Sequence, residues 1–365
     1  MSRRWSLLPP LLVLAILSAC AAPQKPEPAP QPAKAKTQPL PSLLSSVSQP
    51  TTAAQRPEDE AGPPGVESAK AARKASPTKA TCGGQPLRVH FYNVGQALSA
   101  LVDFPDGTHW LVDAGTGATG AREHLTNSLR TDLAGNPIAV MWITHQHADH
   151  MNAAAAVMNQ FPVNVYVDNG FPSAARSAAQ TRHILHAPTD ALSMPAAPVK
   201  VTPFLVASKP KSCPRNQNNC SIGLRIEYCS SSILFVGDAE QEEEALLPHD
   251  QTATLLQVGH HGSPTSSSPA FIDKVAPKYA VISAGKPRQG TNRTYCHPNA
   301  STVTTLDTPL GGTGSQDLEV FAGAKCKGST AKDWRKVKVP DHLWATPRDG
   351  DVVLTTTGDG EFRRE

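Results

Sequence analysis

The feature that most constrains this chain is a cluster of metal-binding side chains directly after a predicted buried strand. Residues 138–143 are apolar and predict that strand, and the run after it reads Thr144-His145-Gln146-His147-Ala148-Asp149-His150. Zinc and similar ions bind imidazole nitrogen and carboxylate oxygen readily, and their ligands need backbone of fixed geometry. A loop of clustered histidines and an acid would be unexplained if it only capped a helix. The run therefore predicts a metal centre at the end of this strand.

Three later motifs offer further ligands. They are Phe235-Val236-Gly237-Asp238, Val258-Gly259-His260-His261-Gly262-Ser263 and Thr294-Tyr295-Cys296-His297-Pro298. A predicted strand that ends in Gly-Asp aims one carboxylate out of the sheet edge, so we interpret Asp238 as a ligand shared by two ions. His297 is the single histidine of its motif, so it is a candidate site residue only because the other motifs are present. Together the motifs predict a centre for two divalent metal ions.

Strand and helix patterns alternate in two successive sets. Apolar spacing with a period of about 3.6 predicts helices over 121–133 and 174–186. This order favours an α+β sandwich of two sheets flanked by helices. Residues 309–343 are rich in Gly and Lys and are interpreted as a long inserted loop. Alternation and short apolar runs predict strands over 87–94, 97–104, 109–112, 138–143, 163–167, 223–227, 232–236, 255–258, 279–283 and 352–356.

Residues 1–19 are typical of a bacterial lipoprotein signal peptide. Arg3 and Arg4 precede an apolar stretch, residues 7–17, which is too short to span a bilayer. Leu17-Ser18-Ala19-Cys20 resembles a lipobox, so we expect cleavage before Cys20 and lipidation of that residue. An ordinary signal peptide can also end in small residues, and Cys20 would then be incidental. We expect an extracytoplasmic protein, lipid-anchored to a bacterial membrane, at the outer membrane or periplasmic face if the cell is Gram-negative.

Residues 20–80 combine the lipidated Cys20 with a linker rich in Pro and Ala. Such a segment buries too little apolar surface to offset the entropy of ordering it, and its prolines favour extended conformations. We therefore expect a disordered, semi-rigid spacer, followed by one hydrolase domain over residues 81–365. The charge is nearly balanced, with 34 Lys and Arg against 31 Asp and Glu. No basic stripe marks strong nucleic-acid binding, and no protein partner can be inferred.

Six cysteines remain after Cys20. An even number in an exported chain predicts disulfides. Cys213 and Cys220 bracket a short polar loop and are the best local pair. The other four, Cys82, Cys229, Cys296 and Cys326, allow three pairings, and a free thiol or metal ligand at Cys296 is the competing interpretation.

The order of these motifs resembles one branch of a known family. The chain is similar to the ComEC-type branch of the metallo-β-lactamase superfamily, the hydrolase domain of DNA-uptake competence proteins, here as a stand-alone lipoprotein. The resemblance spans residues 87–362 and implies the four-layer αββα sandwich. The motifs that carry it are Asn93-Val94-Gly95-Gln96, Leu111-Val112-Asp113-Ala114-Gly115, the run at His145, Gly237-Asp238-Ala239-Glu240, Val258-Gly259-His260-His261-Gly262-Ser263 and His297-Pro298.

The family pattern implies a role for each matching residue. It assigns His145 and His147 to one metal, Asp149 and His150 to the other, and Asp238 to both. One histidine of the pair His260 and His261 would complete the second site. Asp113 would orient a ligand without binding metal itself. Asp149 and His297 are the two catalytic candidates. His297 would hydrogen-bond a phosphate oxygen or protonate a leaving group.

This chain departs from the family at two places. Asn93, Ala97 and Leu98 stand where the branch usually has Asp, Gly and Asp, so contacts made by those acids are in doubt. Between His150 and Asp238 there is also no motif carrying the third histidine that β-lactamases use for the first metal.

The function expected is hydrolysis at two metal ions, Zn²⁺ by ligand type with Mn²⁺ as an alternative. A hydroxide bridging the ions would attack, and such centres suit phosphodiester cleavage by a phosphodiesterase or nuclease. The alternatives are a lactonase or other ester hydrolase, a β-lactamase or thioester hydrolase, and a non-catalytic metal-binding lipoprotein. The absent third histidine argues against the β-lactamase and the thioester hydrolase.

Overall fold

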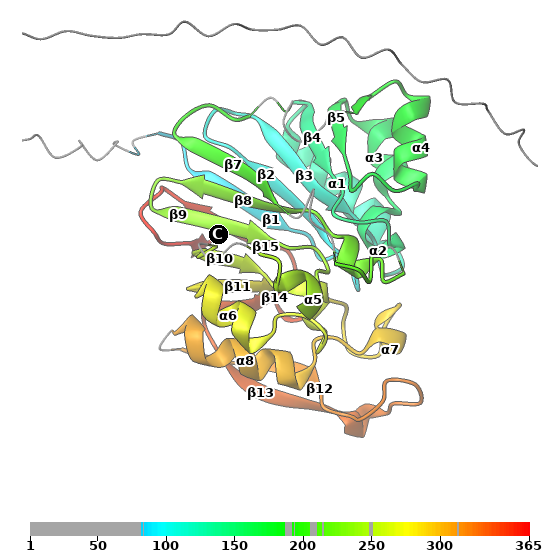
Figure 1. Cartoon of the computed structure of the whole chain (residues 1–365), viewed down its shortest axis with the longest axis vertical. Coiled ribbons are helices and arrows are strands. Elements are labelled where there is room, and N and C mark those ends of the chain that lie inside the picture. Colours follow the sequence, from blue (N-terminus) through cyan, green and yellow to red (C-terminus); the bar gives the residue numbers. More distant parts are fainter. Residues whose placement is uncertain are drawn as a thin grey trace, which may run out of the picture. The chain divides into compact units, whose positions relative to one another are not determined.

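The described residues form two large β-sheets and a separate hairpin (Figure 1). The structure is a computed structural model that describes residues 82, 84–186, 192, 194–204, 210–213, 215–247, 251–311 and 314–365. The predicted signal peptide, Cys20 and the linker 20–80 lie outside the described residues. Within these ranges, no helix is both long and apolar enough to cross a membrane.

The first sheet has eight strands in the order β16-β15-β1-β2-β3-β4-β5-β6. Antiparallel pairing joins β16 through β3, and parallel pairing joins β3 through β6. The predicted strands 87–94 and 97–104 are present but shorter. The bounds are β1 Leu87–Phe91, β2 Ser99–Asp103, β3 His109–Ala114, β4 Ile138–Trp142, β5 Val163–Val167, β6 Leu185–His186, β15 Val352–Thr356 and β16 Arg363–Arg364.

The second sheet has six strands in the order β14-β11-β10-β9-β8-β7. Strands β7 to β9 pair antiparallel, whereas β9, β10, β11 and β14 run parallel. Parallel strands place their carboxyl ends at one edge, where loops carry functional side chains. The bounds are β7 Val199–Phe204, β8 Gly223–Tyr228, β9 Ser231–Phe235, β10 Leu255–Gln257, β11 Tyr279–Ile282 and β14 Leu343–Ala345.

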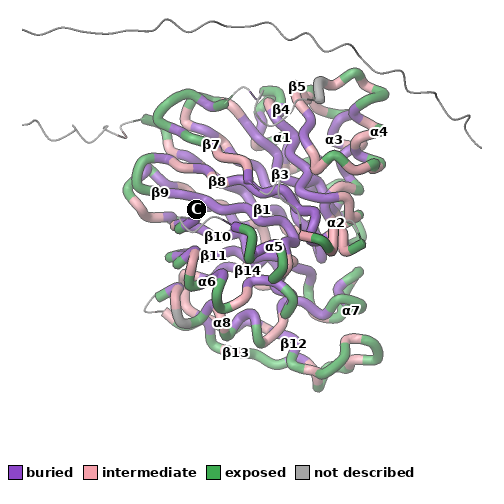
Figure 2. The backbone as a smooth tube through the Cα atoms, viewed as in Figure 1, coloured by how far each residue is buried: buried purple, intermediate pink, exposed green. Residues whose placement is uncertain are grey.

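The two sheets pack face to face over an apolar core. Phe91 of β1 and Phe235 of β9 have ring centroids 5.8 Å apart, which places the two sheets in direct contact. The indole Nε1 of Trp142 donates to the carbonyl oxygen of Ile222 at 3.2 Å, so its one polar group is satisfied inside this core. Both sheets are buried along most of their length (Figure 2). Each fully buried large apolar side chain contributes about 1.5–3 kcal/mol to stability.

Helices cover the outer face of each sheet (Figure 1). Leu125, Leu129 and Leu133 of α1 belong to a second apolar cluster with the outer face of the first sheet. Ile272 of α6 and Leu306 of α8 lie in a third, on the second sheet. This arrangement confirms the predicted α+β, four-layer αββα sandwich. The bounds are α1 Ala121–Leu133, α2 Ala148–Met151, α3 Ala154–Gln160, α4 Ala174–Thr181, α5 Gln241–Glu244, α6 Pro269–Val275, α7 Asn292–Tyr295, α8 Ala300–Leu310 and α9 Thr346–Asp349.

Two predicted segments are wrong. The helix predicted to reach residue 186 ends at Thr181, because His183 adopts a left-handed φ of 55° and β6 then pairs with β5. Residues 309–343 are not an inserted loop: β12 (Ser315–Phe321) and β13 (Trp334–Pro340) form a full antiparallel hairpin. The glycines and lysines of this segment obscured an alternation whose apolar residues pack beside α8.

Three disulfides join the six cysteines that the structure describes, so the predicted Cys213–Cys220 pair is confirmed. Cys82 pairs with Cys229 and Cys296 with Cys326, with Cα atoms 6.4 Å and 5.6 Å apart. The competing interpretation of Cys296 as a free thiol or metal ligand is therefore wrong.

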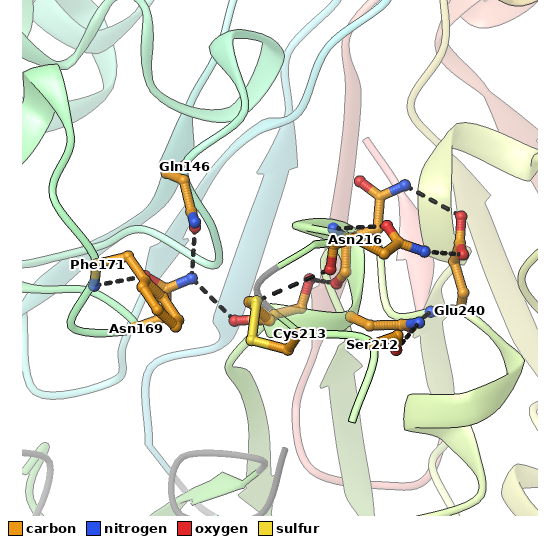
Figure 3. Close-up of a disulfide and its surroundings, with 11 residues drawn as sticks. Gln146, Asn169, Phe171, Ser212, Cys213, Asn216 and Glu240 are labelled. Atoms are coloured by element: carbon orange, nitrogen blue, oxygen red, sulfur yellow. Dashed lines mark hydrogen bonds between the residues drawn. A yellow bond between two sulfur atoms is a disulfide. The ribbon is translucent and has the colours of Figure 1, made fainter. Parts of the chain in front are cut away.

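The Cys213–Cys220 bridge holds the segment that supports Glu240 (Figure 3). Asn216, inside the bridged loop, donates to the Glu240 carboxylate at 2.6 Å. The double variant Cys213→Ser/Cys220→Ser should lower the free energy of unfolding by about 2 kcal/mol, because opening a loop this short restores modest chain entropy. Urea unfolding followed by circular dichroism measures this, beside the exposed control Glu242→Gln. An unchanged midpoint would contradict a structural role for the bridge.

Candidate metal centre

The candidate ligands converge at one edge of the sandwich. Strand β4 ends directly before the histidine run, β9 before Asp238, and β10 before His260 and His261. Because β3 and β4 are parallel, as are β9 and β10, the loops after them gather at shared edges. The structure thus brings together side chains far apart in sequence.

Asp113, near the end of β3, orients the first of them. Its buried carboxylate accepts hydrogen bonds from the N–H of Thr144 at 2.7 Å and from its Oγ1 at 2.8 Å. The same carboxylate lies 2.7 Å from Nδ1 of His150. A carboxylate can only accept, so Nδ1 of His150 donates and Nε2 is the nitrogen left to bind a metal. Asp113 therefore directs Nε2 of His150 toward the centre.

His261 faces His150 with its own Nε2 atom. Nδ1 of His261 lies 2.8 Å from the carbonyl oxygen of Ser283, which can only accept, so Nδ1 donates and Nε2 is the nitrogen directed at the centre. The Nε2 atoms of His150 and His261 are 3.2 Å apart. Two lone pairs at this distance repel each other unless a proton or a cation lies with them. Asp149 adds a carboxylate oxygen 3.5 Å from Nε2 of His261.

Threonine hydroxyls orient His145 and His260 in the same way. Thr144 Oγ1 donates its proton to a carboxylate and lies 3.2 Å from Nδ1 of His145. Thr265 Oγ1 donates to Glu240 at 2.9 Å and lies 3.1 Å from Nδ1 of His260. Each hydroxyl has one proton, so it accepts from the imidazole Nδ1–H, and Nε2 is the nitrogen left to bind a metal.

The two carboxylate oxygens of Asp238 face two separate pairs of histidines. Oδ1 lies 3.1 Å from Nε2 of His150 and 3.7 Å from Nε2 of His261. Oδ2 lies 3.8 Å from Nε2 of His145 and 3.7 Å from Nε2 of His260. The carboxylate of Asp238 thus lies between two pairs of imidazole Nε2 atoms, and each pair faces one of its oxygens.

This donor set fits divalent cations. Ligand atoms of His145, His150 and Asp238 lie within 4.8 Å of one another, and so do those of Asp149, His150 and His261. Among the described residues, Nε2 of His145 is buried and has no hydrogen-bond partner. Burying a polar nitrogen without a partner costs about 1–3 kcal/mol, which a bound cation would recover.

The loop that carries His260 and His261 is held in a strained conformation. Their φ values are 49° and 54°, both in the left-handed region that residues with a β-carbon rarely adopt. Such residues cost about 1–3 kcal/mol each and persist only where the surroundings enforce them. The carboxylate of Glu244 helps to do so, because it accepts from the backbone N–H groups of Ser267 and Ser268 just beyond the loop.

Burial and charge set the ionisation of the centre. Burial lowers the pKa of His145 well below its ordinary value, so the ring is neutral. Burial opposes ionisation of Asp238, but the neighbouring His150, His261 and His260 outweigh it and hold the pKa of Asp238 well below its usual range. The same balance, with His261 as the main partner, lowers the pKa of Asp149. Burial opposes protonation of His150 and His260, but Asp238 and the carboxylates beside them outweigh it and raise the pKa of both rings. A metal ion binds the neutral imidazole and the ionised carboxylate, so it would displace protons from these two rings.

A cavity of about 530 Å³ opens beside the centre. Its walls include His147, Asp149, His260 and the exposed ring of Tyr295. His147 lies next to His145, with ring centroids 4.8 Å apart, but outside the two tightest groups of ligand atoms. The buried ring of His297 lies against His260, with centroids 5.4 Å apart, and burial lowers the pKa of His297 to about 3.

Sequence reasoning missed the groups that orient the ligands. Glu240 and Thr265 turn His260, and the carbonyl oxygen of Ser283 turns His261. Glu240 follows Asp238 within the same motif, which is a signal that could have found it. A backbone carbonyl gives no signal in the sequence. Burial opposes ionisation of Glu240, but hydrogen bonds from His260 and Asn218 lower its pKa to about 2.

Comparison with known proteins agrees with this geometry. The family model described as "Metallo-beta-lactamase superfamily" matches residues 92–286, more than half of the chain. ComE operon protein 3 of Bacillus subtilis is 30% identical over 174 residues, which are 45% of this chain and 21% of that protein. Competence protein ComA of Neisseria gonorrhoeae is 30% identical over 203 residues, 54% of this chain and 27% of that protein. The predicted ComEC-type resemblance is confirmed.

These relatives are much longer than the region they share with this chain, which spans about a quarter of their length. Among solved structures, the metallo-beta-lactamase fold protein YhfI from Bacillus subtilis aligns with a TM-score of 0.37 at 13% identity, covering 55% of this chain and 86% of that one.

Proposed function

We propose that this chain, which belongs to the metallo-beta-lactamase superfamily, is a two-metal phosphodiesterase or nuclease. We propose further that it acts outside the cytoplasm. The observation that carries the proposal is the placement of Asp238, whose two oxygens face separate pairs of imidazole Nε2 atoms. A carboxylate so placed is suited to being shared by two ions.

We assign the ligands by the side of Asp238 on which each lies. His145 and His260 would hold the first ion, with His147 at the cavity wall, and His150, His261 and Asp149 would hold the second. His260 then stands in for the third histidine that is absent between His150 and Asp238. Both members of the His260-His261 pair are thereby used, one at each ion. Imidazole and carboxylate ligands suit Zn²⁺, and Mn²⁺ is the alternative.

When bound, two such ions supply a nucleophilic water at neutral pH and stabilise negative charge on both sides of the reacting centre. The chain's own residues prepare the site for this chemistry. Asp113 and Glu240 keep the ligand rings in one tautomer, and Asp149 borders the cavity where substrate would lie. A phosphodiester, with an attacking and a leaving oxygen in line, matches a two-ion clamp.

The test is hydrolysis by the purified chain with Zn²⁺ or Mn²⁺ supplied separately. Bis-p-nitrophenyl phosphate, single-stranded DNA and nitrocefin should be compared, together with a lactone substrate. We expect turnover of the phosphodiesters and none of nitrocefin. Hydrolysis of the lactone alone would replace the proposal with a lactonase, and bound metal without any turnover would replace it with a metal-binding lipoprotein.

Loss of either histidine of the pair should remove one ion. His260→Ala should empty the first site and His261→Ala the second, because each ring faces a different oxygen of Asp238. Plasma mass spectrometry should find about one metal per chain in each variant and two in the wild type. The exposed His124→Ala serves as the control. Two metals retained in His260→Ala would assign His260 to another role.

We also propose that the chain is anchored by lipid at Cys20, within residues that the structure does not describe. Cys20→Ser should prevent acylation and release the protein from membranes. Fractionation of cells and mass spectrometry of the mature N-terminus measure both effects. A mature wild-type N-terminus that lacks acylated Cys20 would exclude the anchor.

A further inference from the structure

Gln96 lies beside His297. Among the described residues, its side-chain amide is the hydrogen-bond partner of Nδ1 of that ring. The motif Asn93-Val94-Gly95-Gln96 has no role in the proposed metal centre. Nevertheless Gln96 is buried, and its Nε2 lies 3.1 Å from Nδ1 of His297. Its other amide atom, Oε1, accepts from the backbone N–H of Gly285 at 3.1 Å.

The contact to Gly285 settles which way the Gln96 amide points. A backbone N–H can only donate, so the amide atom facing it must be oxygen, and the atom facing His297 must be the NH₂ nitrogen. The nitrogen donates, so Nδ1 of His297 accepts and carries no proton. The one proton of the neutral ring is therefore on Nε2.

His297 thus differs from the four histidines that face Asp238. Their Nδ1 atoms donate to an oxygen and leave Nε2 to bind a metal, whereas His297 accepts at Nδ1 and is arranged to offer an N–H at Nε2. A lone pair suits a cation, and an N–H suits an anionic oxygen. The ring of His297 lies against His260, which lines the cavity beside the metal centre.

The support around Gln96 leaves it little freedom to turn. A β-carbon added at Gly117 would lie 2.3 Å from the backbone oxygen of Gln96, and one at Gly285 would lie 2.9 Å from its backbone nitrogen. The buried Asn292 ties the two loops together, since it donates to the carbonyl oxygens of Gly285 and His297 and accepts from the N–H of His297.

We infer that Gln96 is a positioning residue, which holds His297 in the tautomer with the proton on Nε2 so that His297 donates a hydrogen bond to an anionic oxygen of the substrate. This inference rests on the proposed function for the identity of the substrate, but the tautomer itself does not depend on it. Removing one such preorganised donor costs about 10²–10³-fold in turnover.

The direct test is ¹⁵N NMR of the histidine-labelled full chain, loaded with Zn²⁺, with the His297 signals identified by their absence in His297→Ala. We expect a protonated Nε2 and an unprotonated Nδ1 in the wild type. A proton on Nδ1 instead would overturn the inference, and His297→Ala serves only to identify the signals. If no phosphodiester is cleaved, the proposed function fails while this measurement still decides the tautomer.

Gln96→Glu tests the effect on turnover. The carboxylate has the same shape but only accepts, so the one proton of the neutral His297 ring should move from Nε2 to Nδ1. The Nε2 donor is then lost, and kcat should fall about 10²-fold with two metals still bound. In the His297→Ala background the same change should have almost no further effect, because it acts through that ring. Gln289→Glu, which adds a carboxylate at an exposed position, is the matched control. A full further loss in the His297→Ala background, or unchanged kcat and NMR signals in Gln96→Glu, would overturn the inference.

Discussion

Asp238→Ala should lose both metal ions and lower kcat/KM for bis-p-nitrophenyl phosphate by about 10³-fold or more. The side chain lies between both pairs of histidines, so neither site keeps its carboxylate after the change. Metal ions contribute several kcal/mol of transition-state stabilisation, and each 1.36 kcal/mol corresponds to about tenfold in rate. Metal content by plasma mass spectrometry and hydrolysis rates should be measured on the same preparation.

Glu242→Ala is the control for Asp238, because it removes an exposed acid from the segment that follows. It should keep both metals and the wild-type rate. If Asp238→Ala retained two metals and full activity, Asp238 would not be shared between ions and the proposed centre would be wrong.

The change Asp113→Asn should weaken metal binding at the second site about 10–100-fold. An amide NH₂ in place of the oxygen that faces Nδ1 of His150 would donate rather than accept. The ring would then hold its proton on Nε2, the nitrogen directed at Asp238. Zinc titration of the metal-free protein measures the loss, and the exposed Asp273→Asn serves as the control.

Asp113→Ala should add a loss of stability to the loss of metal. It leaves the N–H of Thr144 and Nδ1 of His150 without their acceptor, in a fully buried place. Removing one partner of a buried charged network costs about 3–5 kcal/mol. Alanine is also strained at the φ of 58° that Asp113 adopts. If both variants bound zinc as tightly as the wild type, Asp113 would not orient a ligand.

The periodic parts of the fold could be predicted from the sequence. Residues 138–143 and 233–236 are unbroken apolar runs, which a strand buried on both faces requires. The hairpin of β12 and β13 could not be predicted in the same way, because charged residues alternate with its apolar ones, with Asp317 opposite Lys338 and Glu319 opposite Lys336. The residue at which α4 ends could not be predicted either, because it depends on the left-handed conformation of His183, which no local sequence pattern indicates.

The candidate ligands were visible in the sequence for a chemical reason: clustered imidazoles and carboxylates have few other uses. The motifs alone therefore determined the family, the two-metal hypothesis and the importance of Asp238. They left His260 and His261 equivalent, since two adjacent residues of one type look alike in a sequence.

Only the tertiary structure separated His260 from His261, by pairing one ring with Thr265 and Glu240 and the other with the carbonyl oxygen of Ser283. It likewise gave Gln96 a role, through a backbone N–H about 190 residues away in the chain. Which nitrogen of an imidazole bears the proton depends on what lies within about 3 Å of the other nitrogen. Those neighbours come from distant strands and from backbone atoms, so the folded chain decides the matter and the sequence by itself does not.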